Sequence, residues 1–517
     1  MANISFITLY DKGCMGTRYL SSLLKAEGHA TSIVYLGRHE GKIKKGNDAL
    51  NSDEDLWISV NEYGKDLVRS YSDPISENDI DILLDLLAKI KPDALGFSLR
   101  SMFLNTATQL VNRIREKFDF PIIFGGIAAT CDPEKCIREA DIVCLGDGEQ
   151  AMLEIARRID KKAPLNDVNN LWVRSNDNIY KNGLYPLEQN LDKFPFPDYD
   201  SLNKFSIHNG ALIENDPAIG NMSKYTYEIV TSRGCPFSCT YCCNDVLKNT
   251  YEGQKYLRRR SVENVIDELK IAKEKHGIKS VLFKDEVFTF DLNWIKNFSE
   301  AYKKEIALPF WCYTYPAFAD SQILNLLKDS GMFNVTMGIQ SGSESILYNT
   351  FNRRTSIEKI ISAADTLIRL KLPIRPRYDI ITNNPFETEN DRQATLELLM
   401  RLDKPVDFGL TKLSFIPGSK IVRMREEKHI TGVVDEDLYK FWNTLYLLNQ
   451  YSFFPNRFIR ALSRSKFFRD KPQFLQLLLV PKFAETKFQG FLDSLKGCIP
   501  GNAILFLKKI RYIVKRY

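Results

Sequence analysis

The sequence predicts an α/β protein of about three domains: a parallel sheet with helices on both faces, a partial (β/α)6 barrel and a mainly helical region. The first observation is length, because 517 residues at roughly 150 residues per domain give about three domains. The second is an alternation of short β-branched runs with helical patterns, which occurs twice along the chain. The third is the loss of that rhythm over residues 161–222. We therefore expect domains at 1–160, 223–431 and 432–517, with 161–222 as a linker.

The first alternating series predicts a doubly wound sheet. We expect strands at 4–9, 31–36, 94–98, 121–124 and 142–145, and helices at 17–27, 77–90, 102–117, 133–139 and 148–159. The polar residues 38–75 look like an insertion. In a sheet of this kind, ligands bind beyond the carboxyl ends of the strands.

The second series predicts the barrel. We expect strands at 228–232, 280–284, 309–313, 334–339, 374–381 and 408–414, and helices at 261–276, 292–305, 320–330, 356–370 and 388–402. Six strands that alternate with helices favour a partial or full α/β barrel, whose active site lies at the carboxyl ends of its strands.

Composition excludes several classes of protein. With 44% apolar residues, 26% charged residues, 27 Gly and 21 Pro, the chain is neither collagen-like nor wholly disordered. Its net charge of +6 is small for a dedicated nucleic-acid binder, and no apolar run reaches the roughly 18 residues of a membrane span. The start, MANISFITLYDKG, has neither the basic segment nor the apolar run of a secretory signal. We therefore expect a cytoplasmic protein.

Four of the ten cysteines lie in one loop, TSRGCPFSCTYCCN, after the first barrel strand. Cys235, Cys239 and Cys242 have the spacing Cys-x3-Cys-x2-Cys, which can direct three thiolates to one point and leave a fourth position open, as an iron–sulfur cubane with one open iron requires. A structural zinc site would need a fourth Cys or His. Cys243 is adjacent to Cys242, and the five histidines form no short pair. Zinc ligands or buried core thiols remain the alternatives.

With Tyr241 just before the third cysteine, this loop resembles the signature of the radical S-adenosylmethionine (radical SAM) enzymes. The resemblance implies a 4Fe–4S cluster on Cys235, Cys239 and Cys242, whose open iron binds the amino and carboxylate groups of SAM. It also implies reductive cleavage of SAM to a 5′-deoxyadenosyl radical that takes hydrogen from a substrate. Such an enzyme needs an external electron donor such as flavodoxin or ferredoxin.

Later barrel segments resemble parts of the same family. Three arginines, 258–260, precede a helix that Ser261 should cap. FKDEVF (283–288) ends the second strand with two acids, at the place where the family's carboxylates face the amino group of SAM. MGIQSGSE (337–344) resembles the fourth-strand motif, with Gln where many relatives have Glu, and the fifth strand carries an arginine suited to a carboxylate. The resemblance implies SAM contacts from Tyr241, Asp285, Glu286, Gln340, Ser341 and Arg377.

A flavodoxin-like domain and a Pro-Phe-Pro linker before such a barrel resemble the cobalamin-binding subclass of this family. The supporting segments follow predicted strands, and their glycines let the backbone approach a large ligand closely. The resemblance implies cobalamin contacts from Asp11, Gly13, Gly16, Ser98, Gly125, Gly126, Gly146, Gly148 and Glu149. Cobalamin mutases have Asp-x-His-x-x-Gly at the first segment, with His on the cobalt, but here the His position is Gly13. The resemblance therefore implies cobalamin without a protein histidine ligand, and it leaves open a domain that has lost cobalamin.

The leading hypothesis is a cobalamin-dependent C-methyltransferase acting on a small molecule or natural-product intermediate. In that scheme, which the resemblance implies, one SAM methylates cobalt and a second generates the radical. Oxidation, cyclisation or ring rearrangement by the same domains is the second hypothesis, and a non-catalytic corrinoid-binding or cluster-binding protein is the third. A methylthiotransferase is disfavoured, because Cys14, Cys131, Cys136 and Cys144 do not form its three further cluster cysteines.

The basic charge is concentrated at the C-terminus. Residues 464–517 contain twelve Lys and Arg but three Asp and Glu, so the rest of the chain is slightly acidic. The segment PGNAILFLKKIRYIVKRY (500–517) could lie on an anionic membrane surface or contact an acidic partner, with a solvated amphipathic helix as the alternative. Six aromatic residues could line a pocket, but their helical spacing is typical of core: Phe441, Trp442, Tyr446, Tyr451, Phe453 and Phe454.

Overall fold

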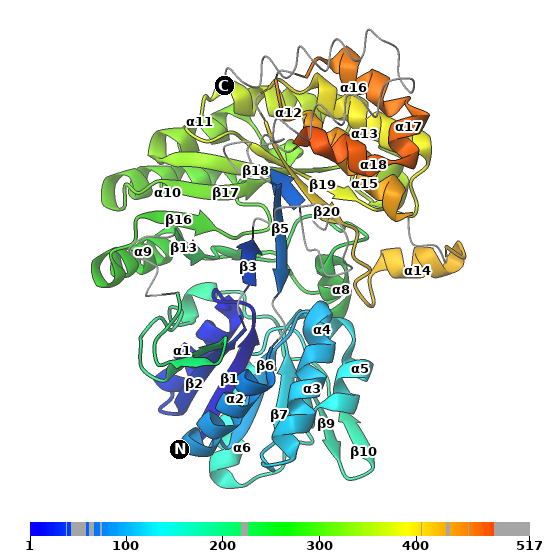
Figure 1. The fold of residues 1–517 in the computed structure, drawn as a ribbon. Helices are drawn as coiled ribbons and strands as arrows, with labels where there is room; N and C mark the ends of the chain where they lie inside the picture. The colour runs from blue at the N-terminus through cyan, green and yellow to red at the C-terminus, as the bar shows by residue number, and fades with distance from the viewer. Residues whose placement is uncertain are drawn as a thin grey trace.

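The computed structural model describes residues 1–37, 39–42, 58–60, 67–72, 75–218, 226–404, 406–430, 435–452 and 454–479. In Figure 1 the N-terminal domain lies below the barrel, and helices α15 to α18 pack on the barrel. Both α/β domains predicted from the sequence are confirmed.

The N-terminal domain is built on a parallel sheet. Its central strands are β1 (Asn3–Leu9), β2 (Ala30–Leu36), β6 (Ala94–Ser98), β7 (Ile122–Gly125) and β8 (Ile142–Cys144), all paired in parallel. Six helices accompany them: α1 (Met15–Ala26), α2 (Glu77–Ile90), α3 (Leu104–Arg115), α4 (Ile127–Cys131), α5 (Pro133–Glu139) and α6 (Glu149–Lys161). The predicted strands are confirmed to within about one residue at each end.

Local sequence explains these elements. The strand side chains of β1 and β2 are almost all buried, as expected for a sheet covered on both faces. Helix α2 begins at a capping box, in which Ser76 Oγ accepts from Asp79 N and the Asp79 carboxylate accepts from Ser76 N. Its buried residues Ile80, Leu83, Leu84 and Leu87 recur at helical spacing and face the sheet.

The predicted linker is wrong as a description of residues 161–222, because this stretch supplies four strands to the N-terminal sheet. Strands β9 (Leu171–Ser175) and β10 (Asn178–Lys181) add to β8 in antiparallel pairing. On the opposite edge, β11 (Lys204–His208) pairs in parallel with β2 and β12 (Ala211–Ile213) pairs with β11. Edge strands are short and only partly covered, so they lack the apolar run that marks a central strand.

Six parallel strands form the partial barrel in the order β13, β16, β17, β18, β19, β20. They are β13 (Thr226–Ile229), β16 (Ser280–Phe283), β17 (Phe310–Thr314), β18 (Met332–Gln340), β19 (Arg377–Thr382) and β20 (Asp407–Lys412). The accompanying helices are α9 (Val262–His276), α10 (Leu292–Glu305), α11 (Ser321–Ser330), α12 (Ile357–Arg369), α13 (Glu389–Arg401) and α14 (Lys420–Glu427). Ser261 caps α9 as predicted, since its Oγ accepts from Asn264 N at 3.1 Å.

The strand predicted at 228–232 divides in two. After β13 the chain forms β14 (Ser232–Arg233), which pairs in antiparallel fashion with β15 (Arg258–Arg259). Between these two short strands lie the cysteine loop and α8 (Cys243–Thr250). The cysteine loop is therefore an excursion whose two ends are joined by a β-ribbon.

The insertion of the N-terminal domain extends the barrel sheet. It contains β3 (His39–Lys42), β4 (Ile58–Val60) and β5 (Leu67–Ser72), and β4 pairs with the last barrel strand through Ile58 and Leu410. Figure 1 shows β3 and β5 in the blue of the N-terminus beside the green and yellow barrel. This segment is held by backbone pairing. Its polar composition therefore did not indicate that it joins the barrel sheet.

The C-terminal helices share the core of the barrel. Helices α15 (Glu436–Leu448), α16 (Asn456–Ser463), α17 (Lys466–Asp470) and α18 (Pro472–Gln476) contribute to the same apolar cluster as the barrel strands. Phe441, Trp442, Tyr446 and Phe454 are buried there and Tyr451 packs against them, which confirms the core interpretation of these aromatic residues. Phe453 lies outside the described residues.

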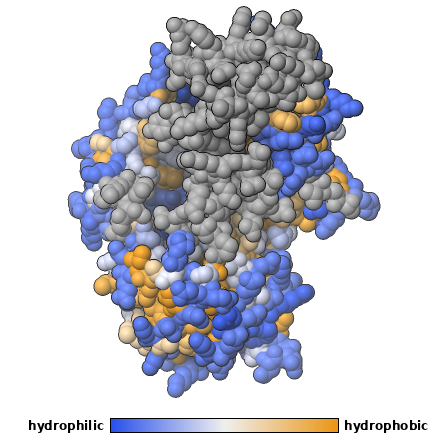
Figure 2. Space-filling view, viewed as in Figure 1, coloured by the Kyte–Doolittle hydropathy of each residue, from blue (hydrophilic) through white to orange (hydrophobic). Residues whose placement is uncertain are grey.

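The membrane prediction concerns residues that the structure does not describe, since 500–517 lie beyond residue 479. Among the described helices, none combines the length and the apolar character that a bilayer span requires. Figure 2 shows hydrophilic and hydrophobic residues mixed over the N-terminal domain on the face in view.

Candidate active site

Cys235, Cys239 and Cys242 lie on the excursion between β14 and α8, beyond the carboxyl end of the first barrel strand. Cys239 is buried and the other two are half-buried, and no cysteine in the described part of the chain is in a disulfide. Cys242 N donates to Cys239 O at 3.1 Å, and Cys242 is the N-cap residue of α8. Three free thiols on one loop form a donor set that suits an iron–sulfur cluster.

Electrostatics distinguishes the two adjacent cysteines. A hydrogen bond with Cys243 lowers the pKa of the Cys242 thiol to about 6, helped by the backbone and side-chain amides of Asn244, although burial works in the opposite direction. The pKa of Cys243 is raised by its contact with Cys242 and by burial. Burial raises the pKa of the Cys235 and Cys239 thiols, so the pKa values do not select the cluster ligands. The assignment of Cys235, Cys239 and Cys242 rests on their spacing. Among the described residues, no group of three or more Cys, His, Asp or Glu side chains is placed to hold a single metal ion.

A second segment, residues 350–353, supports the cysteine loop. Thr240 Oγ1 donates to Thr350 O at 2.5 Å, and Asn352 Nδ2 donates to Ser238 O at 2.8 Å. The Arg353 guanidinium lies 4.0 Å from the centre of the Tyr315 ring and faces the thiol of Cys239. Sequence reasoning missed these residues; the only indication was the run Asn-Arg-Arg soon after the fourth-strand motif.

The two acids that end the second barrel strand have different environments. Asp285 is 1% exposed, and its carboxylate accepts from Thr231 N at 3.1 Å, from Thr231 Oγ1 at 2.7 Å and from Ser232 Oγ. Asp285 therefore anchors the start of the cysteine loop, and its expected contact with SAM stays a prediction. The Glu286 side chain is exposed, yet loss of hydration and then the proximity of Cys242 raise its pKa to about 7. Its carboxyl group therefore lies close to the cysteine loop.

Gln340 and Ser341, two further residues expected to contact SAM, lie at the end of β18 and directly after it. Gln340 ends β18 in a left-handed conformation, and a Cβ on Gly338 would lie 2.5 Å from its amide nitrogen, so the amide folds back over Gly338. Ser341 is fully buried and its Oγ contacts Thr395 Oγ1 at 3.3 Å. Ser341 therefore has a packing role, and the expected SAM contacts of Gln340 and Ser341 stay predictions.

The aromatic and basic candidates of this group also have partners within the chain. Tyr241 packs edge-on against Phe351, with ring centres 4.7 Å apart, in an apolar cluster that includes Ile381. Arg377 Nε lies 3.2 Å from Asp379 Oδ1 and its Nη1 lies 3.7 Å from Asp407 Oδ2. Arg377 thus has carboxylate partners within the barrel, and its expected contact with a carboxylate of SAM or substrate stays a prediction.

A cavity of about 300 Å³ lies at the carboxyl ends of the N-terminal strands. Seven of the nine predicted cobalamin residues line it: Gly16, Ser98, Gly125, Gly126, Gly146, Gly148 and Glu149. Val230 and Arg233 of the barrel complete the wall, so the cavity lies between the two domains. The sequence motifs, scattered over more than 130 residues, therefore converge on one space.

Asp11 and Gly13 are not among the residues that line this cavity. Asp11 Oδ1 accepts from Gly13 N at 3.0 Å and from Cys14 N at 3.1 Å, which shapes the turn after β1. A Cβ on Gly13 would lie 2.5 Å from Glu228 Oε2 of the barrel. A histidine at position 13 would therefore require the Glu228 side chain to move.

The cavity has the shape that a large cofactor needs. A Cβ on Gly16 would meet no atom within 4 Å, so the space in front of this residue is open. Gly126 and Gly146 have φ values of +83° and +63°, in the region that favours glycine. These bare backbone walls fit part of a cobalamin molecule, and the three free thiols of the cysteine loop fit a 4Fe–4S cluster.

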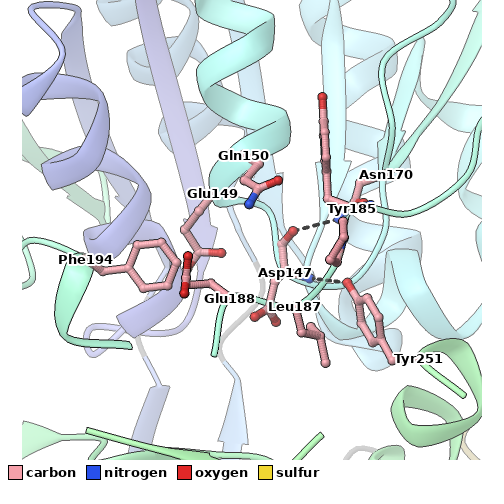
Figure 3. Close-up of a pocket in the computed structure, with 10 residues that line it drawn as sticks. Asp147, Glu149, Gln150, Asn170, Tyr185, Leu187, Glu188, Phe194 and Tyr251 are labelled. Carbon is pink, nitrogen blue, oxygen red and sulfur yellow. Dashed lines mark hydrogen bonds between the residues drawn. The ribbon is translucent and has the colours of Figure 1, made fainter. Parts of the chain in front are cut away.

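The loop 145–149 between the cavity and the barrel is held from several directions. Asn170 Nδ2 donates to Asp147 O at 2.8 Å, and Asp147 N donates to the hydroxyl oxygen of Tyr251 at 2.9 Å. Figure 3 shows both contacts, with Tyr251 reaching across from the barrel. The hydroxyl occupies the space that a Cβ on Gly146 would fill. A small recess next to this loop is lined also by Glu149, Glu188 and Phe194.

Comparisons with known proteins agree with this arrangement. Residues 229–399 match the model of the radical SAM superfamily, and residues 69–156 match the model of the B12-binding domain. Residues 229–399 are therefore a radical SAM domain, and residues 69–156 are a B12-binding domain. Each family match covers one of the two sites described above.

Two curated methyltransferases and one solved structure are similar to this chain over most of its length. An uncharacterized methyltransferase of Pyrococcus horikoshii is 26% identical over 350 residues, which cover 65% of this chain and 70% of that one. The cytidylyl-2-hydroxyethylphosphonate methyltransferase of Streptomyces wedmorensis is 24% identical over 493 residues, 88% of this chain and 85% of that one. The radical SAM methyltransferase TsrM of Kitasatospora setae, solved with cobalamin and a 4Fe–4S cluster, superposes with a TM-score of 0.61 at 15% identity, covering 83% and 75% of the two chains.

The cofactors follow from the two matches. Radical SAM enzymes use a 4Fe–4S cluster and SAM, and the B12-binding domain adds cobalamin. An enzyme of this class also needs a source of electrons. The assignment of single residues to each cofactor stays a prediction.

Proposed function

We propose that this enzyme transfers a methyl group from SAM, through cobalamin, to an unactivated carbon of a small molecule. The observation that carries the proposal is the shared space between the domains: Arg233 lines the cavity of the B12-binding domain and stands two residues before Cys235. The two relatives that are named as methyltransferases over most of their length support the reaction type.

When bound, the cluster supplies the electron that cleaves SAM, and cobalamin supplies a carrier for the methyl group. The protein holds these groups and excludes water. In the proposal, Cys235, Cys239 and Cys242 hold the cluster, while Glu286 and Gln340 orient SAM. The glycine-lined cavity holds cobalamin against Arg233.

The interior of the barrel suits a polar substrate. Along the strands, alternate residues join the core under the helices, as Tyr378 and Phe408 do. The intervening residues face the other side: Tyr313, Thr336, Arg377 and Asp407 stand opposite one another on four neighbouring strands. Such a row of hydroxyl, guanidinium and carboxylate groups supports a small molecule with several polar groups as the substrate.

We propose that a reduced flavodoxin or ferredoxin supplies the electron.

The test uses the full chain, reconstituted without oxygen, with hydroxocobalamin, SAM and a chemical reductant. We expect S-adenosylhomocysteine and 5′-deoxyadenosine to form together, because one SAM gives its methyl group and another is cleaved. Formation of 5′-deoxyadenosine alone would overturn methyl transfer and favour oxidation or cyclisation. If neither product forms although the cluster is reduced, the protein is not an enzyme of this kind.

A further inference from the structure

Asp147 stands between the two cofactor sites. Its side chain lines the cavity of the B12-binding domain, and its Oδ2 atom receives two arginines of the barrel, Arg258 Nη1 at 2.9 Å and Arg233 Nη1 at 3.1 Å. Arg233 also pairs with Glu149 of the cavity wall at 2.6 Å. Burial works to raise the pKa of Asp147, but Arg233 and Arg258 hold it below its usual value.

These two arginines are the two ends of the cysteine excursion. Arg233 on β14 and Arg258 on β15 stand opposite each other in the ribbon that closes the excursion. One carboxylate oxygen of the N-terminal domain therefore fastens both ends of the loop that carries the cluster cysteines. The Arg258 side chain is 1% exposed, that of Arg233 is 23% exposed and that of Asp147 is 31% exposed, so Arg258 is buried while the shared carboxylate is partly open to water.

From this junction a series of contacts, which passes along the side chain of Tyr256, reaches Cys242. Arg258 Nε donates to Tyr256 O at 3.3 Å, and the Tyr256 hydroxyl donates to Asn244 Oδ1 at 2.9 Å. Asn244 Nδ2 in turn lies 3.5 Å from Cys242 Sγ. The return strand also crosses close to Gly234, where a Cβ would lie 2.8 Å from Tyr256 O. Groups of this kind orient metal ligands from outside the coordination sphere.

We propose that Asp147, Arg233, Arg258, Tyr256 and Asn244 form a positioning relay that sets where the cluster stands relative to the cobalamin cavity. None of the five is a metal ligand in this proposal, and they act through the cavity wall and through Cys242. The relay rests on the cofactor assignment but not on methyl transfer.

The first experiment measures the distance between the two cofactors by pulsed electron paramagnetic resonance. The full chain carries a reduced cluster and cobalamin in its paramagnetic Co(II) state, so no substrate or turnover is needed. We expect one narrow distance in the natural protein and a shifted or broadened distribution in Asp147→Asn, which keeps the size of the side chain but removes its charge. The control variant is Arg157→Gln on α6, which breaks an exposed ion pair with Glu27. Its distance distribution should match that of the natural protein. An unchanged distance in Asp147→Asn with both cofactors bound would overturn the proposal.

The second variant tests the far end of the relay with less risk to folding. Tyr256→Phe removes one hydroxyl and leaves the ring against Gly234. We expect the spectrum of the reduced cluster to change shape on addition of hydroxocobalamin in the natural protein, and this response to be lost in Tyr256→Phe at equal iron content. If Asp147→Asn does not fold, this variant decides, and a preserved response overturns the relay. Absence of S-adenosylhomocysteine with a normal distance would instead reject only methyl transfer.

Discussion

The cysteine loop and the cavity of the N-terminal domain present different chemical groups to a cofactor. The loop presents side chains whose chemistry is specific: three thiols, with Cys242 lowered in pKa to about 6 by Cys243 and Asn244. The cavity presents backbone, through glycines at the carboxyl ends of four strands. A change in the loop should therefore abolish chemistry, whereas a change in the cavity should act by filling space. The first two of four predictions test this difference, and the other two test buried charged groups of the N-terminal domain.

The largest effect is expected at the loop. Cys239→Ser should reduce iron content and 5′-deoxyadenosine formation to background, because a serine hydroxyl does not replace a thiolate ligand of the cluster. Hydroxocobalamin should bind as in the natural protein, since Cys239 is not among the residues lining the cavity. Iron analysis and the visible spectrum measure both. A variant that keeps its cluster, or one that loses both cofactors while folded, would contradict the separation of the two sites.

The next effect is expected where the cavity is open. A Cβ at position 16 would have no other atom within 4 Å, so the ring of Gly16→Phe would enter the open cavity. It should weaken hydroxocobalamin binding by at least about tenfold, or 1.4 kcal/mol. Gly16→Ala should weaken binding less, because one methyl group occupies little of the cavity. Spectroscopic titration gives both dissociation constants, and the iron content should not change. Equal binding by Gly16→Phe and the natural protein would remove Gly16 from the site.

A stability effect is expected at the buried ion pair of the N-terminal domain. Arg18 and Asp216 side chains are fully buried, and their atoms Nη2 and Oδ1 are 2.8 Å apart. Asp216→Ala leaves a buried guanidinium without its carboxylate and should cost about 3 to 5 kcal/mol of unfolding free energy. Glu27→Ala, which breaks an exposed pair with Arg157, should cost less than about 1 kcal/mol. Denaturant titration compares the two. A loss of similar size in both variants would show that burial does not set the value of the Arg18 pair.

The last prediction concerns the pH dependence of the unfolding free energy. Asp198 is buried, and although burial works against it, contacts with Lys204, Ser21 and Lys25 lower its pKa from 3.8 to about 2. The ionised carboxylate is therefore favoured by folding, and its contribution of about 2 kcal/mol is present above pH 4 and lost as the pH falls through 2. Unfolding at a series of pH values should show this slope, and Asp198→Asn should flatten it. An identical slope in the variant would assign the acid sensitivity elsewhere.

Much of the fold could be predicted from periodicity. The barrel strands and helices lie within a few residues of their predicted positions, since central parallel strands are apolar on both faces and helices have apolar stripes. The elements that were missed are at edges. Strand β10 has no buried residue, and β4 attaches to β20 through one residue pair. Such strands are held by backbone hydrogen bonds, which any side chain permits.

The candidate site shows the same division. The spacing of Cys235, Cys239 and Cys242 indicated a cluster loop, because thiolate ligands are fixed by residue type. Asp285 and Ser341 were expected at SAM, and the structure shows the partners that both have inside the protein. A polar residue at a strand end can face a ligand or a neighbouring loop, and sequence does not distinguish the two directions.

By itself the sequence determined the order of the domains, the three thiols and the glycines that follow the N-terminal strands. These are local properties of composition and period. Only the tertiary structure decided that seven distant cavity residues converge, that Gly13 packs against Glu228 and that Asp147 receives both ends of the cysteine excursion. These contacts join residues that are up to about two hundred positions apart in the chain, and they exist because the packing of one domain on the other brings strand ends together.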